Sequence, residues 1–251
     1  MARSPMWKEL TAAEIRALAD QDATVIFPVA SMEQHGPHLA VGVDTVLCEG
    51  ICRLAAEAAQ NDLPVIVAPT LWCGMAEHHM AYGGTFTFDI PTYRAVLMAF
   101  LKSIERHGFT KVLIVNGHGG NISALASFLG DFAVETKLKV RATTYFELAQ
   151  AAIDPILEDQ ERIRHACEGE TSLMMALAPD LVRHDKLSGA VDPARTTPLP
   201  LGVDRYRSFR SFSETGVVGD ARKATKEKGD RLAAVCRDAI VAVLKDPEAW
   251  A

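Results

Sequence analysis

The sequence predicts an α/β protein in which helices cover both faces of a mostly parallel sheet. Two observations support this fold class. Short apolar runs rich in β-branched residues alternate along the chain with segments of helical period. Most of these runs are continuously apolar, which is typical of strands that are buried on both faces.

Four strands and six helices follow from these patterns. The predicted strands lie at residues 23–30, 64–69, 111–116 and 138–144. The predicted helices lie at residues 11–20, 44–60, 91–107, 121–136, 169–178 and 221–245. In the second helix, the apolar residues recur with a helical period and form one stripe toward the sheet, namely Val46, Leu47, Ile51, Leu54 and Ala58. Since no repeat or low-complexity tract interrupts the chain, we treat residues 1–251 as a single domain.

The stretch from 188 to 220 departs from this pattern. It is rich in proline and glycine, including Pro193, Pro198 and Gly202, and it has little periodicity. A long irregular connection inside a compact domain is usually a functional loop or part of an interface. We therefore expect this stretch to contact the substrate or a neighbouring subunit.

Length and composition exclude several classes of protein. The chain has 251 residues, 49% of them hydrophobic, and its 26 basic and 32 acidic side chains give a net charge of −6. Such a chain buries a core of its own and is not disordered. It lacks the basic excess of a nucleic-acid-binding protein, and no apolar run is long enough to span a membrane. The first residues lack an export signal and the five cysteines form no CxxC pair, so we expect a cytoplasmic protein.

Chemically active side chains collect where the predicted strands end. In an open parallel sheet, ligands bind beyond the carboxyl ends of the strands. Six of the eight histidines lie in four loops that are predicted to share this edge. The candidate residues in these loops are Glu33, His35, His38, Asp44, Glu77, His78, His79, His118, His165, Glu168 and Glu170.

This set of side chains suits a metal site. Glu33 and His35 are two residues apart, so an extended backbone points both side chains the same way. Carboxylates and imidazoles without a pair of thiolates favour zinc, manganese or another divalent first-row ion. Several carboxylates beside two or three imidazoles can hold two ions about 3.5 to 4 Å apart, with an aspartate between them.

Each candidate also has a local explanation. Asp44 could cap the helix that follows it, and Glu170 lies in the first turn of a predicted helix, where the backbone dipole favours an acid. His38, His79 and His107 resemble ordinary histidines of loops or helix ends. The convergence of four loops on one edge favours the metal site over these explanations taken together.

Other mechanisms have less support. The chain lacks the GxSxG, HExxH and GxGxxG motifs of serine hydrolases, zinc peptidases and dinucleotide-binding proteins. Cys167 and His165 are too close in sequence to place thiol and imidazole readily within hydrogen-bond reach. The glycine loop at 116–121 could hold a phosphorylated metabolite in a non-catalytic binding protein, but this alternative leaves the carboxylates unexplained.

Three motifs occur in order along the chain. They are EQHGPHL at 33–39 with a following Asp44, NGHGGN at 116–121 and HACEGETS at 165–172, with further similar stretches at 191–195 (VDPAR) and 224–229 (ATKEKG). Together they resemble the creatininase, or creatinine amidohydrolase, family over nearly the whole chain. The resemblance implies a three-layer α/β/α fold, two divalent ions of zinc or manganese, hydrolysis of C–N bonds in cyclic or linear amides, and assembly into hexamers.

The resemblance also implies a role for individual residues. By position, Glu33 and His118 are implied to bind one ion and His35 the other, while Asp44 bridges the two. His165, which opens the last motif, is implied to transfer a proton during the reaction.

Two departures from the family pattern bear on the site. Creatininase has a metal-binding glutamate two residues after the NGH histidine, and here that residue is Gly120. We expect Glu170 to complete the second ion's ligands and to take part in catalysis. Creatininase shapes its pocket with two tryptophans in a region that has none here, 143–166. The substrate is therefore creatinine or another family substrate, such as a formamidopyrimidine nucleotide, a keto-inositol derivative or a peptide precursor.

The sequence thus predicts a metal-dependent amidohydrolase that acts on a small linear or cyclic amide. A hydroxide held between two ions attacks the substrate carbonyl, and His165 delivers a proton to the departing nitrogen. Glu77, His78 and Tyr145 are the predicted substrate contacts. We expect a homo-oligomer that binds neither nucleic acid nor membrane. An inactive relative that keeps the metal only for assembly is an alternative.

Overall fold

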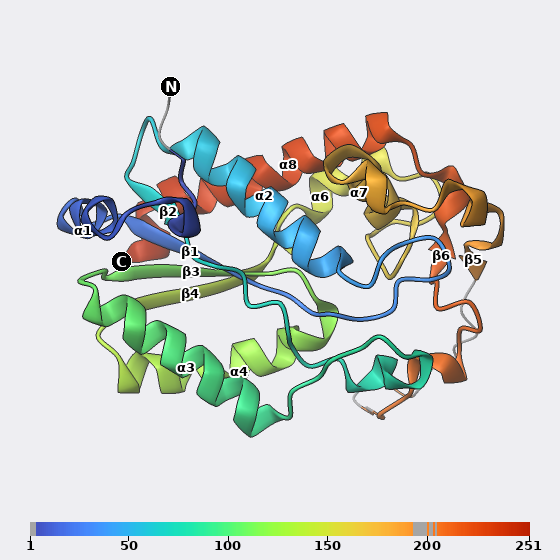
Figure 1. The fold of residues 1–251 in the computed structure, drawn as a ribbon, viewed down its shortest axis with the longest axis horizontal. Helices are drawn as coiled ribbons and strands as arrows, with labels where there is room; N and C mark the ends of the chain where they lie inside the picture. Colours follow the sequence, from blue (N-terminus) through green and yellow to red (C-terminus); the bar gives the residue numbers. More distant parts are fainter. Residues whose placement is uncertain (1–3, 193–199, 201–202, 204) are drawn as a thin grey trace.

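The computed structural model describes residues 4–192, 200, 203 and 205–251. Its centre is a four-stranded parallel sheet with the strand order β2–β1–β3–β4 (Figure 1). The strands are β1 (Thr24–Val29), β2 (Val65–Val67), β3 (Lys111–Asn116) and β4 (Lys139–Thr144). All four predicted strands are confirmed, although β2 is shorter than the apolar run that predicts it.

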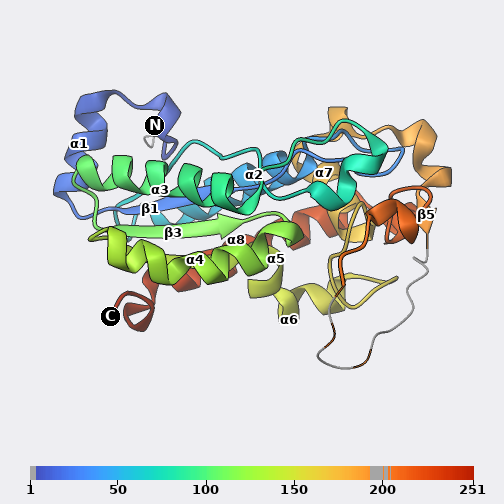
Figure 2. The same ribbon diagram turned by 90° about the horizontal axis from the view of Figure 1, so that it is seen from below.

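Helices cover both faces of this sheet, as Figures 1 and 2 show. One face is covered by α2 (Val43–Ala59) and α8 (Lys226–Lys245), and α7 (Glu168–Leu177) packs against these two helices beyond the ends of the strands. The other is covered by α3 (Ile90–Arg106) and α4 (Ile122–Glu135), with α1 (Ala12–Asp20) at its margin. Two short helices follow β4, α5 (Tyr145–Leu148) and α6 (Gln150–Ile153). The predicted α/β class is therefore confirmed.

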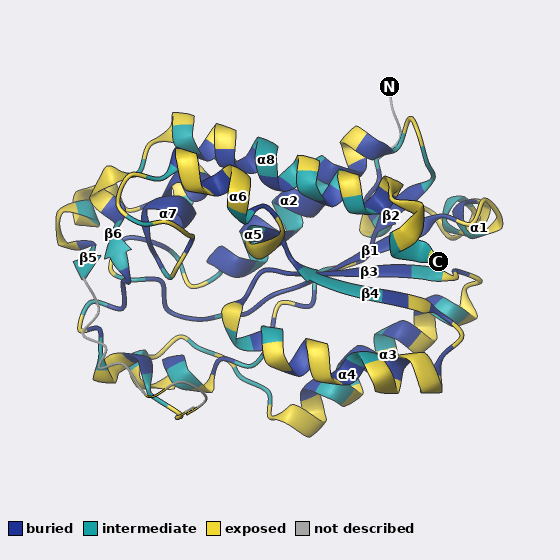
Figure 3. Ribbon diagram, turned by 180° about the vertical axis from the view of Figure 1, so that it is seen from behind, coloured by how far each residue is buried: buried dark blue, intermediate teal, exposed yellow. Residues whose placement is uncertain are grey.

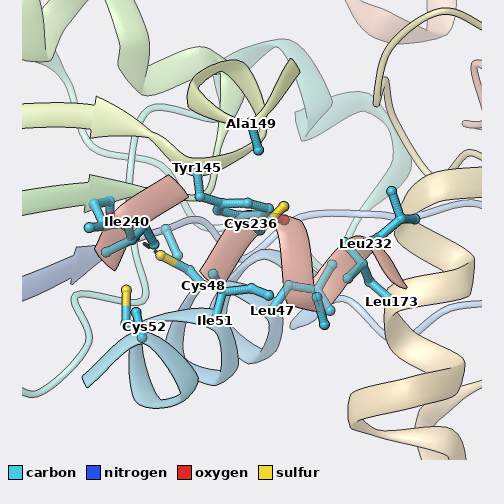
Figure 4. Packing of buried hydrophobic residues seen from close by; sticks show 14 of the residues in the cluster. Leu47, Cys48, Ile51, Cys52, Tyr145, Ala149, Leu173, Leu232, Cys236 and Ile240 are labelled. Atoms are coloured by element: carbon cyan, nitrogen blue, oxygen red, sulfur yellow. Dashed lines mark hydrogen bonds between the residues drawn. The ribbon is translucent and has the colours of Figure 1, made fainter. Parts of the chain in front are cut away.

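Alternate residues of the strands face two separate hydrophobic cores. Ile26 and Leu113 belong to the core under α2 and α8, whereas Val25 and Phe27 belong to the core under α3 and α4. Figure 3 shows a largely buried sheet, with its edge strand β4 mostly at intermediate burial, between helices whose outer faces are exposed. In the first core, Tyr145 of α5 lies beside α8 (Figure 4). Burial on both faces of the sheet thus explains the continuous apolar runs from which the strands are predicted.

The helix boundaries agree with the predictions to within one residue, except at the start of α8. This helix begins at Lys226, because the Thr225 hydroxyl caps it by accepting a hydrogen bond from the backbone N–H of Lys228. A 3₁₀ turn precedes it where the sequence predicts the first helical turn. A second correction concerns Asp44, because Gly42 is the N-cap of α2 and Asp44 lies within the first turn.

The strand order explains which helix covers which face. The chain steps from β1 to β2 on one side and then crosses to β3 on the other side of β1. Crossover connections between parallel strands are right-handed, so steps in opposite directions place α2 and α3 on opposite faces. The change of direction leaves the carboxyl ends of β1 and β3 as the expected place for a ligand.

The irregular stretch from 188 to 220 is only partly described. It contains β5 (Val191–Asp192), which pairs in antiparallel fashion with β6 (Gly219–Asp220), and a 3₁₀ turn at Phe209–Ser211. The prolines and glycine that mark it, Pro193, Pro198 and Gly202, lie outside the described residues. Among the described helices, none combines the length and apolar character needed to cross a bilayer.

Candidate metal centre

Five buried side chains meet beyond the carboxyl ends of β1 and β3. Glu33 and His35 follow β1, His118 follows β3, Asp44 lies in the first turn of α2 and Glu170 in the first turn of α7. Each is between 1% and 5% exposed. The structure therefore brings together all five side chains that the sequence analysis assigns to metal binding.

Asp44 lies between two imidazole rings. Its Oδ1 is 3.1 Å from Nε2 of His35, and its Oδ2 is 3.0 Å from Nδ1 of His118. Oε2 of Glu33 is 3.2 Å from the same nitrogen of His118. One carboxylate is thus shared by two groups of potential ligands, as an aspartate between two ions would be.

Glu170 adjoins the cluster next to His35. Its Oε2 lies 3.8 Å from Nε2 of His35 and accepts a hydrogen bond from the backbone N–H of Ala166. Ala166 has a φ of +49°, in the left-handed region that residues other than glycine rarely adopt. This turn aims the Ala166 N–H at the carboxylate and fixes Glu170 next to His35.

Several atoms of the cluster lack the partners that buried polar atoms normally have. Oε2 of Glu33, Nε2 of His35 and Oδ2 of Asp44 have no hydrogen-bond partner among the described residues. Unpaired buried polar atoms are costly, and a bound cation would satisfy all three. Ligand atoms of Glu33, His35 and Asp44 also lie within 4.8 Å of one another. These features fit a metal ion.

In His35 and His118, the ring nitrogen that points away from Asp44 fixes the tautomer of the neutral imidazole. Nδ1 of His35 lies 3.1 Å from the carbonyl oxygen of Glu33, and Nε2 of His118 lies 3.2 Å from that of Met75. A carbonyl oxygen can only accept, so these nitrogens carry hydrogen in the neutral rings. The nitrogens that face Asp44 then have free lone pairs, which is the arrangement common in metal-binding histidines.

The pKa values of the cluster reflect its buried charge. Burial lowers the pKa of His118, but attraction to Glu33 and Asp44 outweighs burial and raises this pKa to about 10. Burial likewise opposes protonation of His35, and Asp44 and Glu170 raise its pKa well above the usual value. Burial raises the pKa of Glu33 and of Glu170. Without metal, protons on the imidazoles therefore compensate the carboxylates, and a cation that binds here takes their place.

His165 lies at the edge of the cluster with one nitrogen directed toward it. Its Nε2 is 2.7 Å from the carbonyl oxygen of Gln34, so this nitrogen donates and Nδ1 keeps the lone pair. Nδ1 is 3.5 Å from Oε1 of Glu33. Burial, followed by repulsion from His35 and His79, lowers the pKa of His165 well below its usual value. The ring is therefore neutral at pH 7 and can accept a proton.

Cys167, two residues further along, is not a nucleophile. Burial raises the pKa of its thiol to about 12, so almost no thiolate exists at neutral pH. Its sulfur accepts a hydrogen bond from the backbone N–H of Arg164 at 3.3 Å. The thiol therefore helps to shape the loop that carries His165.

His79 belongs to the site, although the sequence analysis places it among the ordinary loop histidines. Its ring is 1% exposed and its Nε2 lies 3.3 Å from Oε1 of Glu33. Burial lowers its pKa to about 2, so the ring is neutral. The only signal in the sequence is its position next to His78, and packing across the chain decides that the His79 ring faces Glu33.

The other two histidines with local explanations lie outside the cluster. His38 is fully buried, with Nε2 2.7 Å from the Thr171 hydroxyl of α7. His107 ends α3 and contacts the ring of Trp7. Among the described residues, His38 therefore links the loop after β1 to α7, and His107 packs on Trp7.

Of the three predicted substrate contacts, only His78 lines the cavity at the cluster. Glu77 is exposed and is absent from the described cavity wall, because the 3₁₀ turn Glu77–Tyr82 points it to solvent. Tyr145 is 1% exposed and packs in the core between α2 and α8 (Figure 4). Its neighbour Phe146 lines the cavity instead, since successive residues of α5 face different directions.

The cavity has a volume of about 300 Å³ and combines the polar cluster with an apolar wall. Phe209 from the irregular stretch covers two of the histidines, with its ring centre 4.4 Å from that of His79 and 4.7 Å from that of His165. Phe146, Ile163 and Val218 complete the apolar part of the wall. The stretch predicted to contact the substrate thus contributes two residues to the cavity wall, Phe209 and Val218.

Gly120, the position of the family glutamate, has no room for a side chain. A Cβ atom there would lie 2.4 Å from Nε2 of His118 and 2.4 Å from the carbonyl oxygen of Met75. Any side chain would therefore displace the ring that His118 presents to the cluster. Glu170 is the remaining carboxylate that can complete the ligands near His35.

Replacing Gly120 by alanine is expected to weaken metal binding by about 10- to 100-fold, the range for changes that disturb the support of a ligand. Isothermal titration with Zn²⁺ or Mn²⁺ measures this effect. Gly119→Ala is the matched control, because a Cβ atom at Gly119 would meet nothing within 4 Å. Equal affinities of the two variants would show that the close approach at Gly120 does not matter.

A parallel α/β fold with a buried carboxylate–imidazole cluster is typical of metal-binding hydrolases, and here the cluster lies at the carboxyl ends of β1 and β3, where the chain changes direction across the sheet. The family comparison is more specific, because the family model for creatininase, described as creatinine amidohydrolase, matches residues 8–244. The chain therefore belongs to the creatininase family, as the motifs indicate.

Similar proteins of this family cover nearly the whole chain. The mycofactocin precursor peptide peptidase of Mycobacterium tuberculosis is 29% identical, over 94% of this chain and 90% of its own. The creatinine amidohydrolase of Pseudomonas putida is 28% identical, over 98% of both chains. A solved structure of creatininase with manganese is 27% identical over 97% and 98% of the two chains, with a TM-score of 0.81. A Zn–Zn form of a creatininase variant, with the same identity and coverage, has a TM-score of 0.80.

Proposed function

We propose that this protein is an amidohydrolase that uses two divalent metal ions to cleave a C–N bond of a small amide. The observation that carries this proposal is the position of Asp44. Its two oxygens lie 3.1 and 3.0 Å from nitrogens of two different imidazoles, His35 and His118. Such a carboxylate is suited to bridge two cations.

The ligands divide into two groups around Asp44. Glu33 and His118 would hold one ion, and His35 and Glu170 the other. Imidazole and carboxylate ligands suit Zn²⁺ and Mn²⁺, and the similar structures include forms with each metal. When bound, the ions would polarise the substrate carbonyl and lower the pKa of water to about 7.

His165 is the proposed proton carrier. Its Nδ1 has a free lone pair and lies beside Glu33, while its Nε2–H is fixed on the carbonyl oxygen of Gln34. The neutral ring can take a proton from the attacking water and deliver it to the amide nitrogen as the C–N bond breaks. Positioned general acid–base groups of this kind contribute about 10²- to 10⁴-fold to the rate.

The cavity favours a substrate with an apolar or planar part. Phe209 and Phe146 line it together with the polar cluster, and a planar ring stacks well on aromatic side chains. Creatinine, named for one relative, is planar, and a precursor peptide, named for another, can present an apolar side chain. Formamidopyrimidines and keto-inositols are the further candidates.

A substrate panel tests the proposed function. Protein reconstituted with Zn²⁺ or Mn²⁺ is expected to hydrolyse at least one member of a panel of creatinine, cyclic amides, short peptides, formamidopyrimidines and keto-inositols. Treatment with a chelator should abolish turnover, and added metal should restore it. Hydrolysis that is unaffected by chelation would refute the metal mechanism. Chelator-resistant binding of a phosphorylated metabolite without turnover would favour the non-catalytic alternative.

We also propose that the protein is a cytoplasmic homo-oligomer, with a hexamer implied by the family resemblance. Trp72, Phe86 and Ile90 are large apolar side chains with exposed fractions of 45%, 59% and 57%, and exposed apolar surface of this kind is typical of contacts between subunits. Light scattering of the purified protein measures the mass of the assembly.

A further inference from the structure

The side-chain amide of Gln34 is held in one orientation beside the cluster. Its Oε1 accepts a hydrogen bond from the backbone N–H of Gly36 at 2.9 Å, so its Nε2 is the donor. This Nε2 lies 3.0 Å from Nδ1 of His79 and 3.2 Å from the carbonyl oxygen of Gly216. Nε2 of His165 is also close, at 2.9 Å, but it already donates to the carbonyl oxygen of Gln34 and cannot accept. The two amide hydrogens of Gln34 therefore go to His79 and Gly216.

This arrangement fixes the tautomer of His79. A neutral imidazole carries one ring hydrogen, and because Nδ1 accepts from Gln34, that hydrogen lies on Nε2. Nε2 is the atom 3.3 Å from Oε1 of Glu33. His79 thus presents an N–H to the cluster, whereas His35 and His118 present lone pairs. An N–H cannot bind a metal ion.

The irregular stretch reaches this group through Gly216. Its φ is +79°, and a Cβ atom there would lie 2.0 Å from Oε1 of Gln34. Only glycine allows the backbone to approach the amide this closely. The turn at 213–217 therefore holds Gln34 against His79.

We propose that Gln34 and His79 position Glu33 for metal binding. The Nε2–H of His79 donates to Oε1 of Glu33 and leaves Oε2 as the oxygen that faces Nδ1 of His118, 3.2 Å away. The competing possibility is that His79 is itself a ligand, because Glu33, His79 and His165 also offer atoms within 4.8 Å of one another. The proposal rests on the proposed function in one respect, since it takes Glu33 as a metal ligand.

Metal titration of the metal-free protein separates these possibilities. His79→Leu removes the donor, and His79→Gln keeps an N–H donor near the position of Nε2. We expect His79→Leu to bind as many Zn²⁺ ions as the wild type but about 10- to 100-fold more weakly, as is found when a group that orients a ligand is lost. His79→Gln should recover most of the affinity. His107→Leu is the control for loss of an imidazole outside the cluster, because His107 lies at the end of α3 against Trp7, and this variant should bind Zn²⁺ as the wild type does.

Each contrary outcome has a distinct meaning. If His79→Leu bound fewer ions than the wild type, His79 would be a ligand and the proposal would be overturned. An unchanged affinity of His79→Leu would also overturn the proposal, and so would a His79→Gln variant that binds as weakly as His79→Leu. If His79→Leu does not fold, Gln34→Leu should give the same weakening with the imidazole intact, and an unchanged affinity would overturn the proposal. A wild-type protein that binds no metal would instead refute the proposed function itself.

Discussion

Replacement of Asp44 by asparagine is expected to lower kcat by more than about 100-fold, beyond the range for residues that only support a ligand. Asparagine has nearly the same shape but no charge, and one of its terminal atoms is an amide nitrogen that repels a cation. Asp44 is the side chain that lies 3.0 to 3.1 Å from both His35 and His118, so its loss affects both groups of ligands. The variant should also retain fewer metal ions than the wild type.

Steady-state kinetics and metal analysis of the same preparation test this prediction. Circular dichroism establishes that the variant is folded. Asp131→Asn is a suitable control, because Asp131 is an exposed residue of α4 that pairs with Arg94, away from the cluster. Full activity and two bound ions in Asp44→Asn would rule out a bridging role for this carboxylate.

Replacement of His165 by asparagine is expected to lower kcat by about 10²- to 10⁴-fold, the contribution of a positioned acid–base group. Metal content should not change, because His165 is proposed to move a proton and not to hold an ion. The pKa of His165 is lowered well below its usual value by burial and by the neighbouring imidazoles. The acidic fall in the wild-type kcat that belongs to His165 should therefore lie at a pH well below 6.5, where the ring gains a proton and can no longer accept one from water.

The pH profile distinguishes a proton carrier from a structural residue. The acidic fall in kcat that belongs to His165 should be absent from His165→Asn, in addition to the lower rate. An unchanged kcat would place the proton carrier elsewhere. Loss of a metal ion would instead make His165 a ligand, which its position within 4.8 Å of ligand atoms of His35 and Glu170 allows.

The fold could be predicted because its main signals are local. Continuous apolar runs predict β1 and β3, and helical periodicity places α2 and α3 to within one residue. The start of α8 could not be placed in this way, since it depends on the Thr225 cap and not on periodicity. Irregular turns such as the one at Phe209–Ser211 have no periodicity from which to predict them.

The site could be predicted only as a set of residues. Glu33, His35 and His118 follow strands whose carboxyl ends share one edge, so their meeting is a consequence of topology. The directions of single side chains depend on packing across the chain. His79 turns inward where Phe209, 130 positions later, covers its ring, and Tyr145 turns into the core where α8 packs. Neither choice is visible in the neighbouring sequence.

Metal analysis of the protein purified without a chelator tests the central claim most directly. The shared position of Asp44 predicts close to two divalent ions per chain, and their removal should abolish hydrolysis while the α/β fold persists. A folded protein that hydrolyses its substrate at the full rate with no bound metal would contradict the claim.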